Sequence, residues 1–443
     1  MLVLVHARLW DGTGAAVQPD VDLLIDEGRI VAIGSSLPVP EGTQTLDLAG
    51  ATVLPGLIDA HVHVASEPGQ THRNPTPEHH AELVAAHLRA YVACGVTTVL
   101  DTGILPDDLA TVRALEAQEA VMPRFLTLGT LLAPEGGYPA NVIPAFPTVG
   151  TPTEVARALD LLVDQGAVGV KTTVEQGLFG HGWPLYTPEV AAAIREGAAE
   201  RGLRIFTHAM SVDEQDEALD LLAPAVFVHP PDRPNGRLRE RLVAAGVAEI
   251  STLTVVDEMR GAWEPERFTD PLTRLVVPEE QLATALDRDA RKAFLHGMLE
   301  VALPAMPAKG LVASMVARES TVRGRLRRQG AALRDLADAG VPIVLGSDSG
   351  SWPLIPYAVH GPTTLRELGL LVDAGFTPEE ALTAGTRTAA DVLGLDDVGT
   401  VEVGNVADLV IVDGDPLQDV GVLWHTTWVV RGGEVRTPEA WVR

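Results

Sequence analysis

Short apolar runs with β-strand character recur along the middle of this chain, and a segment with helical periodicity follows each of them. Eight such runs lie at 57–64, 96–103, 125–132, 167–173, 204–209, 225–230, 249–256 and 342–350. The helical segment at 187–202 begins with Thr-Pro-Glu and ends at a glycine, as helices commonly do. Alternation of strand and helix predicts a parallel sheet, and eight repeats predict an α/β fold of the (β/α)8 TIM-barrel type.

The two ends of the chain have a different texture. Residues 1–55 and 400–443 consist of short apolar runs with a similar texture, and in 1–55 these runs are separated by Asp-Gly, Glu-Gly and Ala-Gly, which are typical of strands joined by tight turns. Neither segment alone buries much surface, so we predict one small composite β-sandwich domain built from both termini. The barrel then occupies 56–399. Its connection at about 257–341 is too long for a simple loop and has helical patterns, so we expect a helical insertion or lid there.

Composition narrows the range of partners. The 443 residues carry a formal net charge of −27, which repels nucleic acid and anionic lipid. No apolar run approaches the roughly eighteen residues of a membrane span, and the start lacks the basic region and cleavage site of a signal peptide. The single cysteine, Cys94, excludes an intramolecular disulfide and a thiolate zinc cage. We therefore expect a cytoplasmic protein that acts on a small molecule, without nucleic acid or membrane partners.

Metal-binding residue types occur at the carboxyl ends of the predicted strands, where barrels of this kind carry their functional residues. Two imidazoles lie two residues apart on the first strand, which places them on the same face. The full set is His61, His63, Lys171, His208, His229 and Asp348. Imidazole and carboxylate suit zinc, manganese, iron, cobalt or nickel. The set predicts a metal centre with an open position for water.

Each of these residues also has a simpler explanation when it is taken alone. A histidine at a strand end is commonly a buried hydrogen-bonding residue. Asp348 could cap a turn, or could be the elbow nucleophile of an α/β-hydrolase, although Pro353 and Pro356 argue against the helix that an elbow needs. Lys171 could extend toward solvent or pair with Glu175. It is, however, one of three lysines in a chain with 33 lysines and arginines, and the six residues together favour the metal site.

The chain resembles the metal-dependent amidohydrolases over essentially its whole length. The similarity is carried by GLIDAHVHV at 56–64 and by GTVEVGNVADLVIVDGDP at 399–416. In the binuclear branch of that family, a lysine on the fourth strand reacts with carbon dioxide, and its carbamate bridges two divalent metal ions. Arginine cannot do this because its guanidinium stays charged, whereas a buried lysine exposes a free amine. The resemblance gives Lys171 this role.

The resemblance also distributes the other ligands. His61, His63 and Asp348 would bind the more buried metal ion, and His208 and His229 the more exposed one, with zinc as the expected metal. Asp348 would also take a proton from a metal-bridging hydroxide and pass it to the leaving group. One departure is that residues 228–230 read Val-His-Pro where many relatives have Glu-His-Gly, so the loop next to the second metal ion differs.

The segment at 359–395 is similar to the prolidase-like and amidase-like branch, which hydrolyses dipeptides, N-acyl amino acids and related amides. The expected reaction is therefore cleavage of an amide C–N bond in a small molecule. Four residues in loops after the strands are candidates for substrate binding, with ordinary loop packing as the alternative: Tyr138, His181, Trp183 and His360. Members of this family are often oligomers, so by analogy the resemblance suggests a homo-oligomer.

Three other functions stay open. The same site could hydrolyse a lactone, a carbamate or an organophosphate ester, because nothing in the sequence distinguishes a nitrogen from an oxygen leaving group. A mononuclear deaminase would use the histidine pair, His208 and Asp348 with one metal ion. Its acid would be Glu214, six residues past His208, and Lys171 would be unexplained. A barrel kept as a binding or assembly protein would be expected to have lost ligands.

Overall fold

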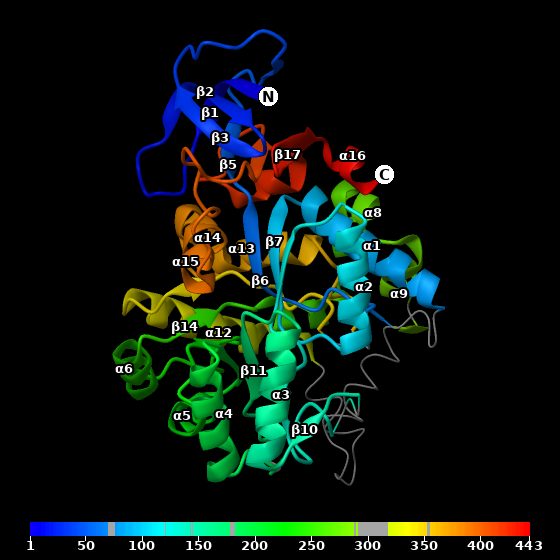
Figure 1. Ribbon diagram of the computed structural model, residues 1–443, viewed down its shortest axis with the longest axis vertical. Coiled ribbons are helices and arrows are strands. Elements are labelled where there is room, and N and C mark those ends of the chain that lie inside the picture. The colour runs from blue at the N-terminus through cyan, green and yellow to red at the C-terminus, as the bar shows by residue number, and fades with distance from the viewer. Residues whose placement is uncertain are drawn as a thin grey trace.

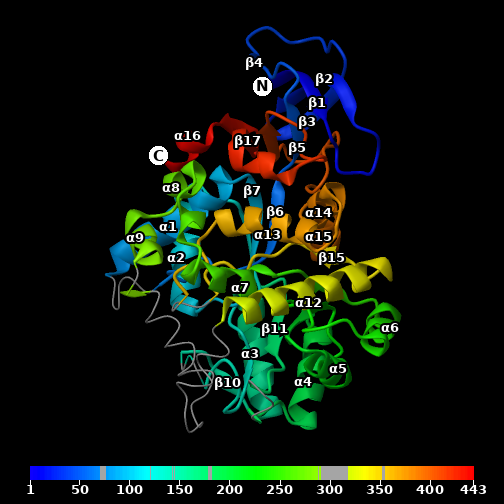
Figure 2. The same ribbon diagram turned by 180° about the vertical axis from the view of Figure 1, so that it is seen from behind.

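The computed structural model has an α/β fold in which a sheet from both termini lies at one end and strands flanked by helices make up the rest (Figures 1 and 2). It describes residues 1–69, 76–119, 121–141, 143, 145–177, 182–287, 289–290, 318–351 and 355–443. No helix among these residues is long and apolar enough to cross a membrane.

The terminal sheet joins the two ends of the chain, with both termini near it in Figure 1. Its strands are β1 (Leu2–Leu9), β2 (Gln18–Asp26), β3 (Arg29–Gly34), β4 (Gln44–Asp47), β5 (Thr52–Pro55), β16 (Leu409–Val412), β17 (Thr426–Arg431) and β18 (Glu434–Arg436). The order is β18-β17-β16-β5-β1-β2-β3, with β4 beside β1, and β16 is antiparallel to β5. Where we expected a β-sandwich, the strands form one continuous eight-stranded sheet with its own hydrophobic cluster.

The eight strands expected in the middle of the chain form two parallel sheets. The first contains β6 (Leu57–Val62), β7 (Val96–Asp101) and β8 (Arg124–Thr127). The second contains β11 (Gly169–Thr173), β12 (Arg204–His208), β13 (Val226–Phe227), β14 (Ala248–Ile250) and β15 (Ile343–Val344). Backbone bonds join their edges, because Val168 N–H donates to the Thr127 carbonyl at 2.9 Å and Ala60 N–H donates to the Leu345 carbonyl at 3.0 Å.

The seventh of these strands is shorter than the sequence suggested. We expected a strand over 249–256, but β14 ends at Ile250 and the helix α7 (Thr254–Asp257) follows. The carboxylate of Glu367 accepts the Leu253 and Thr254 N–H groups at 3.0 and 2.7 Å. A buried side chain more than a hundred residues away thus supplies the acceptors for this helix start, and no local pattern reveals it.

Helices connect the parallel strands, and threonine followed by proline begins many of them. The Thr187 hydroxyl accepts the Val190 N–H, and Thr151 forms a capping box with Glu154, as expected for these residue types. The helices are α1 (Pro77–Ala93), α2 (Pro106–Ala117), α3 (Pro152–Asp164), α4 (Pro188–Glu200), α5 (Val212–Leu221), α6 (Gly236–Ala245), α13 (Pro362–Asp373), α14 (Pro378–Ala384), α15 (Arg387–Leu393) and α16 (Pro438–Val442). Shorter elements are β9 (Ala133–Pro134), β10 (Thr148–Val149) and the 3-10 helix η4 (Val420–His425).

The long seventh connection is helical in the part that the structure describes. It contains η2 (Glu258–Ala262), η3 (Pro265–Phe268), α8 (Pro271–Val276), α9 (Glu279–Leu286) and the long α12 (Glu319–Asp338), which crosses the view of Figure 2. Asp257 is fully buried and forms ion pairs with Arg260 and Arg267, which anchors the start of this segment. Residues 291–317 of the predicted insertion lie outside the described residues.

Candidate metal centre

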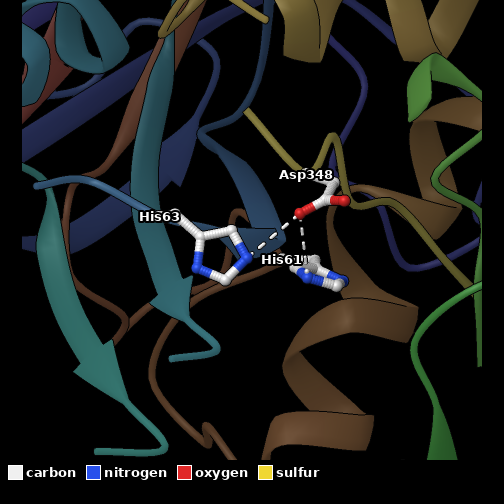
Figure 3. Close-up of side chains that lie close together, drawn as sticks. All are labelled: His61, His63 and Asp348. Carbon is white, nitrogen blue, oxygen red and sulfur yellow. Dashed lines mark ion pairs between the residues drawn. The ribbon is translucent and has the colours of Figure 1, made fainter. Parts of the chain in front are cut away.

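The carboxyl end of β6 and the segment after β15 bring two imidazoles and a carboxylate together (Figure 3). Asp348 N–H donates to the His61 carbonyl at 2.7 Å, and His63 N–H donates to the Ser349 carbonyl at 2.9 Å. This backbone pairing sets the side chains, so that Oδ1 of Asp348 lies 3.1 Å from Nε2 of His61 and 3.1 Å from Nε2 of His63. Ligand atoms of the three residues all lie within 4.8 Å of one another.

Hydrogen bonds on the far side of each ring fix which nitrogen is protonated. Nδ1 of His61 lies 3.1 Å from the Val228 carbonyl, and Nδ1 of His63 lies 3.2 Å from the Gly103 carbonyl. A carbonyl oxygen only accepts, so both Nδ1 atoms carry hydrogen, and Nε2 is the nitrogen that each ring turns toward Asp348. Burial and the positive charge of Lys171 lower the pKa of His61 to about 3. Its bare nitrogen therefore faces a carboxylate oxygen, which is repulsive unless a cation lies between them.

Asp348 itself is held in an unusual conformation. Its φ of 53° lies in the left-handed region, which costs a residue with a side chain about 1 kcal/mol or more. The side chain is buried, and its Oδ1 accepts no hydrogen bond of normal geometry among the described residues. Although burial opposes ionisation, the pKa of Asp348 lies well below its ordinary value, and its partner His63, whose own pKa Asp348 raises despite burial, favours the carboxylate anion.

Lys171 lies inside the second parallel sheet, on β11, and is 2 % exposed. Burial lowers the pKa of its amine from 10.5 to about 7, although Asp348 and Asp101 favour the charged form. Its charge contributes to the lowered pKa of both His61 and His229, so the amine belongs to the same electrostatic environment as the histidines. Near neutral pH a large fraction of Lys171 is a free amine.

His208 and His229, at the ends of β12 and β13, complete a row of imidazoles. The ring centroids of His229 lie 4.9 Å from His61 and 4.6 Å from His208. Nδ1 of His229 lies 2.9 Å from the Thr252 hydroxyl, which donates its own hydrogen to the Val228 carbonyl at 3.1 Å. Thr252 therefore accepts from Nδ1–H, and Nε2 of His229 keeps a free lone pair.

The carboxylate of Glu175 orients the His208 ring, although the sequence suggested Lys171 as its partner. Nε2 of His208 lies 3.2 Å from the Glu175 carboxylate, so Nε2 is the donor and Nδ1 is left to bind a ligand. Although burial opposes it, this bond lowers the pKa of Glu175. The expectation was that Glu175 could pair with Lys171; it lies two residues after β11 and contacts His208 instead.

The deaminase alternative had assigned Glu214 as its acid. In the structure Glu214 is buried, and it accepts the Gln176 and Met210 N–H groups, each at 3.0 Å. Burial and the neighbouring Glu175 raise its pKa. Both carboxylate oxygens of Glu214 thus hold the backbone around the site.

Two of the four candidate substrate-binding residues form an aromatic stack beside His208. The Tyr138 and Trp183 rings are stacked with centroids 5.7 Å apart and planes 2° apart, and Tyr138 lies 4.9 Å from the His208 ring. Burial raises the pKa of Tyr138 above its ordinary value, so its hydroxyl stays a hydrogen-bond donor. His181 lies outside the described residues.

The fourth candidate, His360, lies inside the protein. It is 2 % exposed, its Nε2 lies 2.9 Å from the Ser66 carbonyl, and its Nδ1 lies 2.9 Å from the Tyr91 hydroxyl. Both ring nitrogens are therefore engaged inside the protein. We expected a substrate contact, and the structure instead gives His360 two protein partners behind Asp348.

These donors fit divalent metal ions. The carboxylate oxygen of Asp348 and Nε2 of His61 face each other without a hydrogen bond of normal geometry, and His208 and His229 each keep one nitrogen free. Imidazole nitrogens held by hydrogen bonds on their opposite side, together with a carboxylate, are the ligand set of many catalytic metal sites.

Comparison of this sequence with models of protein families identifies the family to which the chain belongs. The family model described as "Amidohydrolase family" matches residues 52–435. This chain belongs to the amidohydrolase family. The match includes the strands that carry the histidines, Lys171 and Asp348, and ends in the terminal sheet.

Enzymes are among the proteins that this chain resembles. The chain is 32% identical over 208 residues to the adenine deaminase of Methanoregula boonei, which is 45% of this chain and 32% of that protein. Thus the match spans about a third of that relative's length. This chain is also 27% identical to the imidazolonepropionase of Deinococcus radiodurans, and that match covers 90% of this chain and 87% of that protein. A solved Xaa-Pro dipeptidase with bound methionine has the same fold, with a TM-score of 0.73, 22% identity and 98% and 99% of the two chains covered.

Proposed function

We propose that this amidohydrolase is a metal-dependent hydrolase that cleaves an amide C–N bond of a small molecule, such as a dipeptide, an N-acyl amino acid or a related amide. The observation that carries the proposal is the buried Lys171, whose pKa is lowered to about 7, beside four imidazoles and Asp348. A lysine ammonium would only repel metal ions there. A lysine that becomes an anion would instead complete their ligand set.

Lys171 would become that anion by reaction with carbon dioxide. The neutral amine nitrogen forms a bond to the carbon of CO2 and loses a proton, which leaves a carbamate with two oxygen donors. His61, His63 and Asp348 would hold one divalent ion, His208 and His229 the second, and the carbamate both, with zinc as the first expectation and manganese, iron, cobalt or nickel as others. When bound, such ions lower the pKa of water toward 7 and polarise a carbonyl.

The chain's own residues would handle the protons of the reaction. Asp348, an anion with a low pKa, would accept a proton from the attacking water and deliver it to the leaving nitrogen. Tyr138 would donate a hydrogen bond to substrate oxygen, because its hydroxyl stays protonated and lies in the field of Glu175 and Asp348. The Tyr138–Trp183 stack would form an apolar wall for the substrate next to His208.

Arg325 supports a substrate with a free carboxylate. It lies on α12 one turn before Gln329, whose side-chain amide donates to the Pro230 carbonyl, directly after His229, at 3.4 Å. Residues four apart share a helix face, so Arg325 lies on the side of α12 that contacts this loop. Burial lowers the pKa of Arg325, whereas the negative charges of Glu175, Asp232 and Glu214 favour its charged form. Among the described residues no carboxylate lies within ion-pair distance of it, which leaves the guanidinium for a substrate anion.

We also propose the wider organisation that the sequence suggested. Residues 56–399 would form a closed (β/α)8 barrel, and 1–55 with 400–443 a composite β-domain. The edge-to-edge bonds of Ala60 and Val168 and the separate hydrophobic cluster of the terminal sheet support this division.

The test begins with metal content per chain after purification with bicarbonate and a divalent metal, followed by a panel of N-acyl amino acids and dipeptides. We expect about two metal ions, amide hydrolysis, and loss of both in Lys171→Arg. Lys171→Ala supplied with a short carboxylic acid should regain part of each, because the acid can occupy the place of the carbamate. Retention of two metal ions and full turnover in Lys171→Arg would refute the bridging role.

Other outcomes of the same panel identify the alternatives. Turnover of lactones, carbamates or organophosphate esters, with no amide hydrolysis, would keep the site and change the leaving group. One metal ion that does not depend on Lys171, together with ammonia release from a base such as adenine, would instead support a mononuclear deaminase.

A further inference from the structure

A chain of buried hydrogen bonds runs behind Asp348, and its direction can be assigned at every link. The Ser66 carbonyl can only accept, so Nε2 of His360 donates to it at 2.9 Å. Burial lowers the pKa of His360, so the ring is neutral and its Nδ1 accepts from the Tyr91 hydroxyl at 2.9 Å. Tyr91 in turn accepts from the Ser349 hydroxyl, which accepts from Ser347 at 3.0 Å.

Ser347 and Ser349, which begin this series of hydrogen bonds, flank Asp348. The Ser349 N–H also donates to the Ser347 hydroxyl at 3.2 Å, so the side chains bridge the turn in which Asp348 has a φ of 53°. The buried carboxylate of Asp59 also accepts the Ser347 N–H at 2.9 Å, the Thr364 hydroxyl at 2.6 Å and the His61 N–H at 3.2 Å. The turn is thus held by the serine side chains and by Asp59, which also bonds to the backbone of His61.

Two further contacts restrict where His360 can lie. The ring of His87 is tilted against it with centroids 3.9 Å apart, and His87 is itself fixed by the Val64 carbonyl and the Gln281 amide, each at 2.9 Å. A Cβ added to Gly350 would lie 2.7 Å from the His360 ring and 2.5 Å from the His63 carbonyl. A side chain at position 350 would therefore displace the His360 ring or the His63 carbonyl.

We infer that Tyr91 and His360 are positioning residues for Asp348. Through Ser349 and Ser347 they keep the left-handed turn that points Oδ1 of Asp348 at Nε2 of His61 and of His63. The inference rests on the proposed function, since Asp348 there binds metal and moves the proton. It assigns α1 and the segment before α13 a part in a site whose ligands come from the strands.

The first test is the affinity of the metal-free protein for zinc, measured by competition with a chelator, in wild type and in Tyr91→Phe. Removing the Tyr91 hydroxyl leaves the ring packed but breaks the series of hydrogen bonds between Ser349 and His360. Loss of a hydrogen-bond partner that supports a metal ligand costs ~10–100-fold in metal affinity. Tyr186→Phe is the control for loss of a buried tyrosine hydroxyl, because the Tyr186 hydroxyl bonds to backbone groups of Leu132 and Thr173 and, among the described residues, to no member of the Ser347–His360 hydrogen-bond chain. It should stay within about threefold of wild type.

A double-mutant cycle separates positioning from a general structural effect. In an Asp348→Asn background, Tyr91→Phe should change zinc affinity and kcat much less than in wild type, because both changes act on one group. Additive effects would overturn the inference. His360→Leu should behave like Tyr91→Phe, and His360→Asn should recover much of the loss, since its amide oxygen can accept where Nδ1 does.

A crystal structure of Tyr91→Phe gives a readout that needs neither metal nor substrate. We expect the turn to relax from its φ of 53° and Oδ1 of Asp348 to move away from the imidazoles. An unmoved Asp348 would refute the positioning role. If wild type hydrolyses no amide, the proposed function fails, while zinc affinity and this structure still decide the role of Tyr91 and His360.

Discussion

Replacing Lys171 by methionine tests the property on which the proposed chemistry depends. Methionine is unbranched like lysine and one atom shorter, and it cannot carry charge. In the metal-free protein the amine of Lys171 has a pKa of about 7, against 10.5 ordinarily. Between these values the unfolded chain holds a proton that the folded chain lacks, so the stability of wild type should rise with pH by up to about 1.4 kcal/mol per pH unit. Below pH 7 both states are protonated and this slope vanishes.

The methionine variant should therefore be more stable than metal-free wild type by roughly 5 kcal/mol at pH 6, and the two should converge near pH 10.5. Urea denaturation from pH 6 to 10, in chelator and CO2-free buffer, measures the difference, because groups that do not interact with Lys171 contribute equally to both proteins. A difference that does not change with pH would mean that Lys171 titrates as an exposed lysine. In that case the free amine needed for carbamate formation would be scarce at neutral pH.

Three further substitutions separate the roles of the remaining residues. Asp348→Asn should lower kcat by ~10²–10⁴-fold with a smaller loss of metal, measured by steady-state kinetics and elemental analysis; an unchanged rate would remove its proton role. Glu175→Gln, which can still accept from His208 but is uncharged, should weaken binding of one of two metal ions by ~10-fold, and equal weakening of both would contradict its link to His208. Arg325→Met should raise KM for a carboxylate-bearing substrate by ~10–100-fold and leave KM for the matching neutral amide unchanged, and Arg325→Lys should recover part of the loss.

The alternation of strands and helices could be predicted because its signals are local. Short apolar runs, each followed by a helical pattern, predicted all eight parallel strands, and a Thr-Pro start predicted helices such as α4. The seventh strand was predicted too long because its end depends on Glu367, whose carboxylate accepts the Leu253 and Thr254 N–H groups. A contact that joins residues more than a hundred positions apart leaves no periodic trace in either segment.

The candidate site divides in the same way. His61 and His63 could be paired from their spacing, and Asp348 from the end of the last strand, because parallel strands place their carboxyl ends together. What the sequence could not reveal is which partner fixes each ring. Glu175 was considered for Lys171 and lies on His208 instead, and His360 was expected to face substrate but bonds to Tyr91 and Ser66. Side-chain direction at a strand end depends on neighbouring loops, not on spacing.

The charge of Lys171 connects carbon dioxide to metal binding. As an ammonium it contributes to the low pKa of His61 and His229, and the same positive potential opposes a metal cation at those rings. As a carbamate it would carry a negative charge in the same buried place, where charges interact more strongly than in water. Each event then favours the other, and this coupling must be equal in both directions. Under the proposed function, a site that holds a bare nitrogen of His61 against the carboxylate of Asp348 would therefore be stabilised by metal and carbamate together, and by neither alone to the same degree.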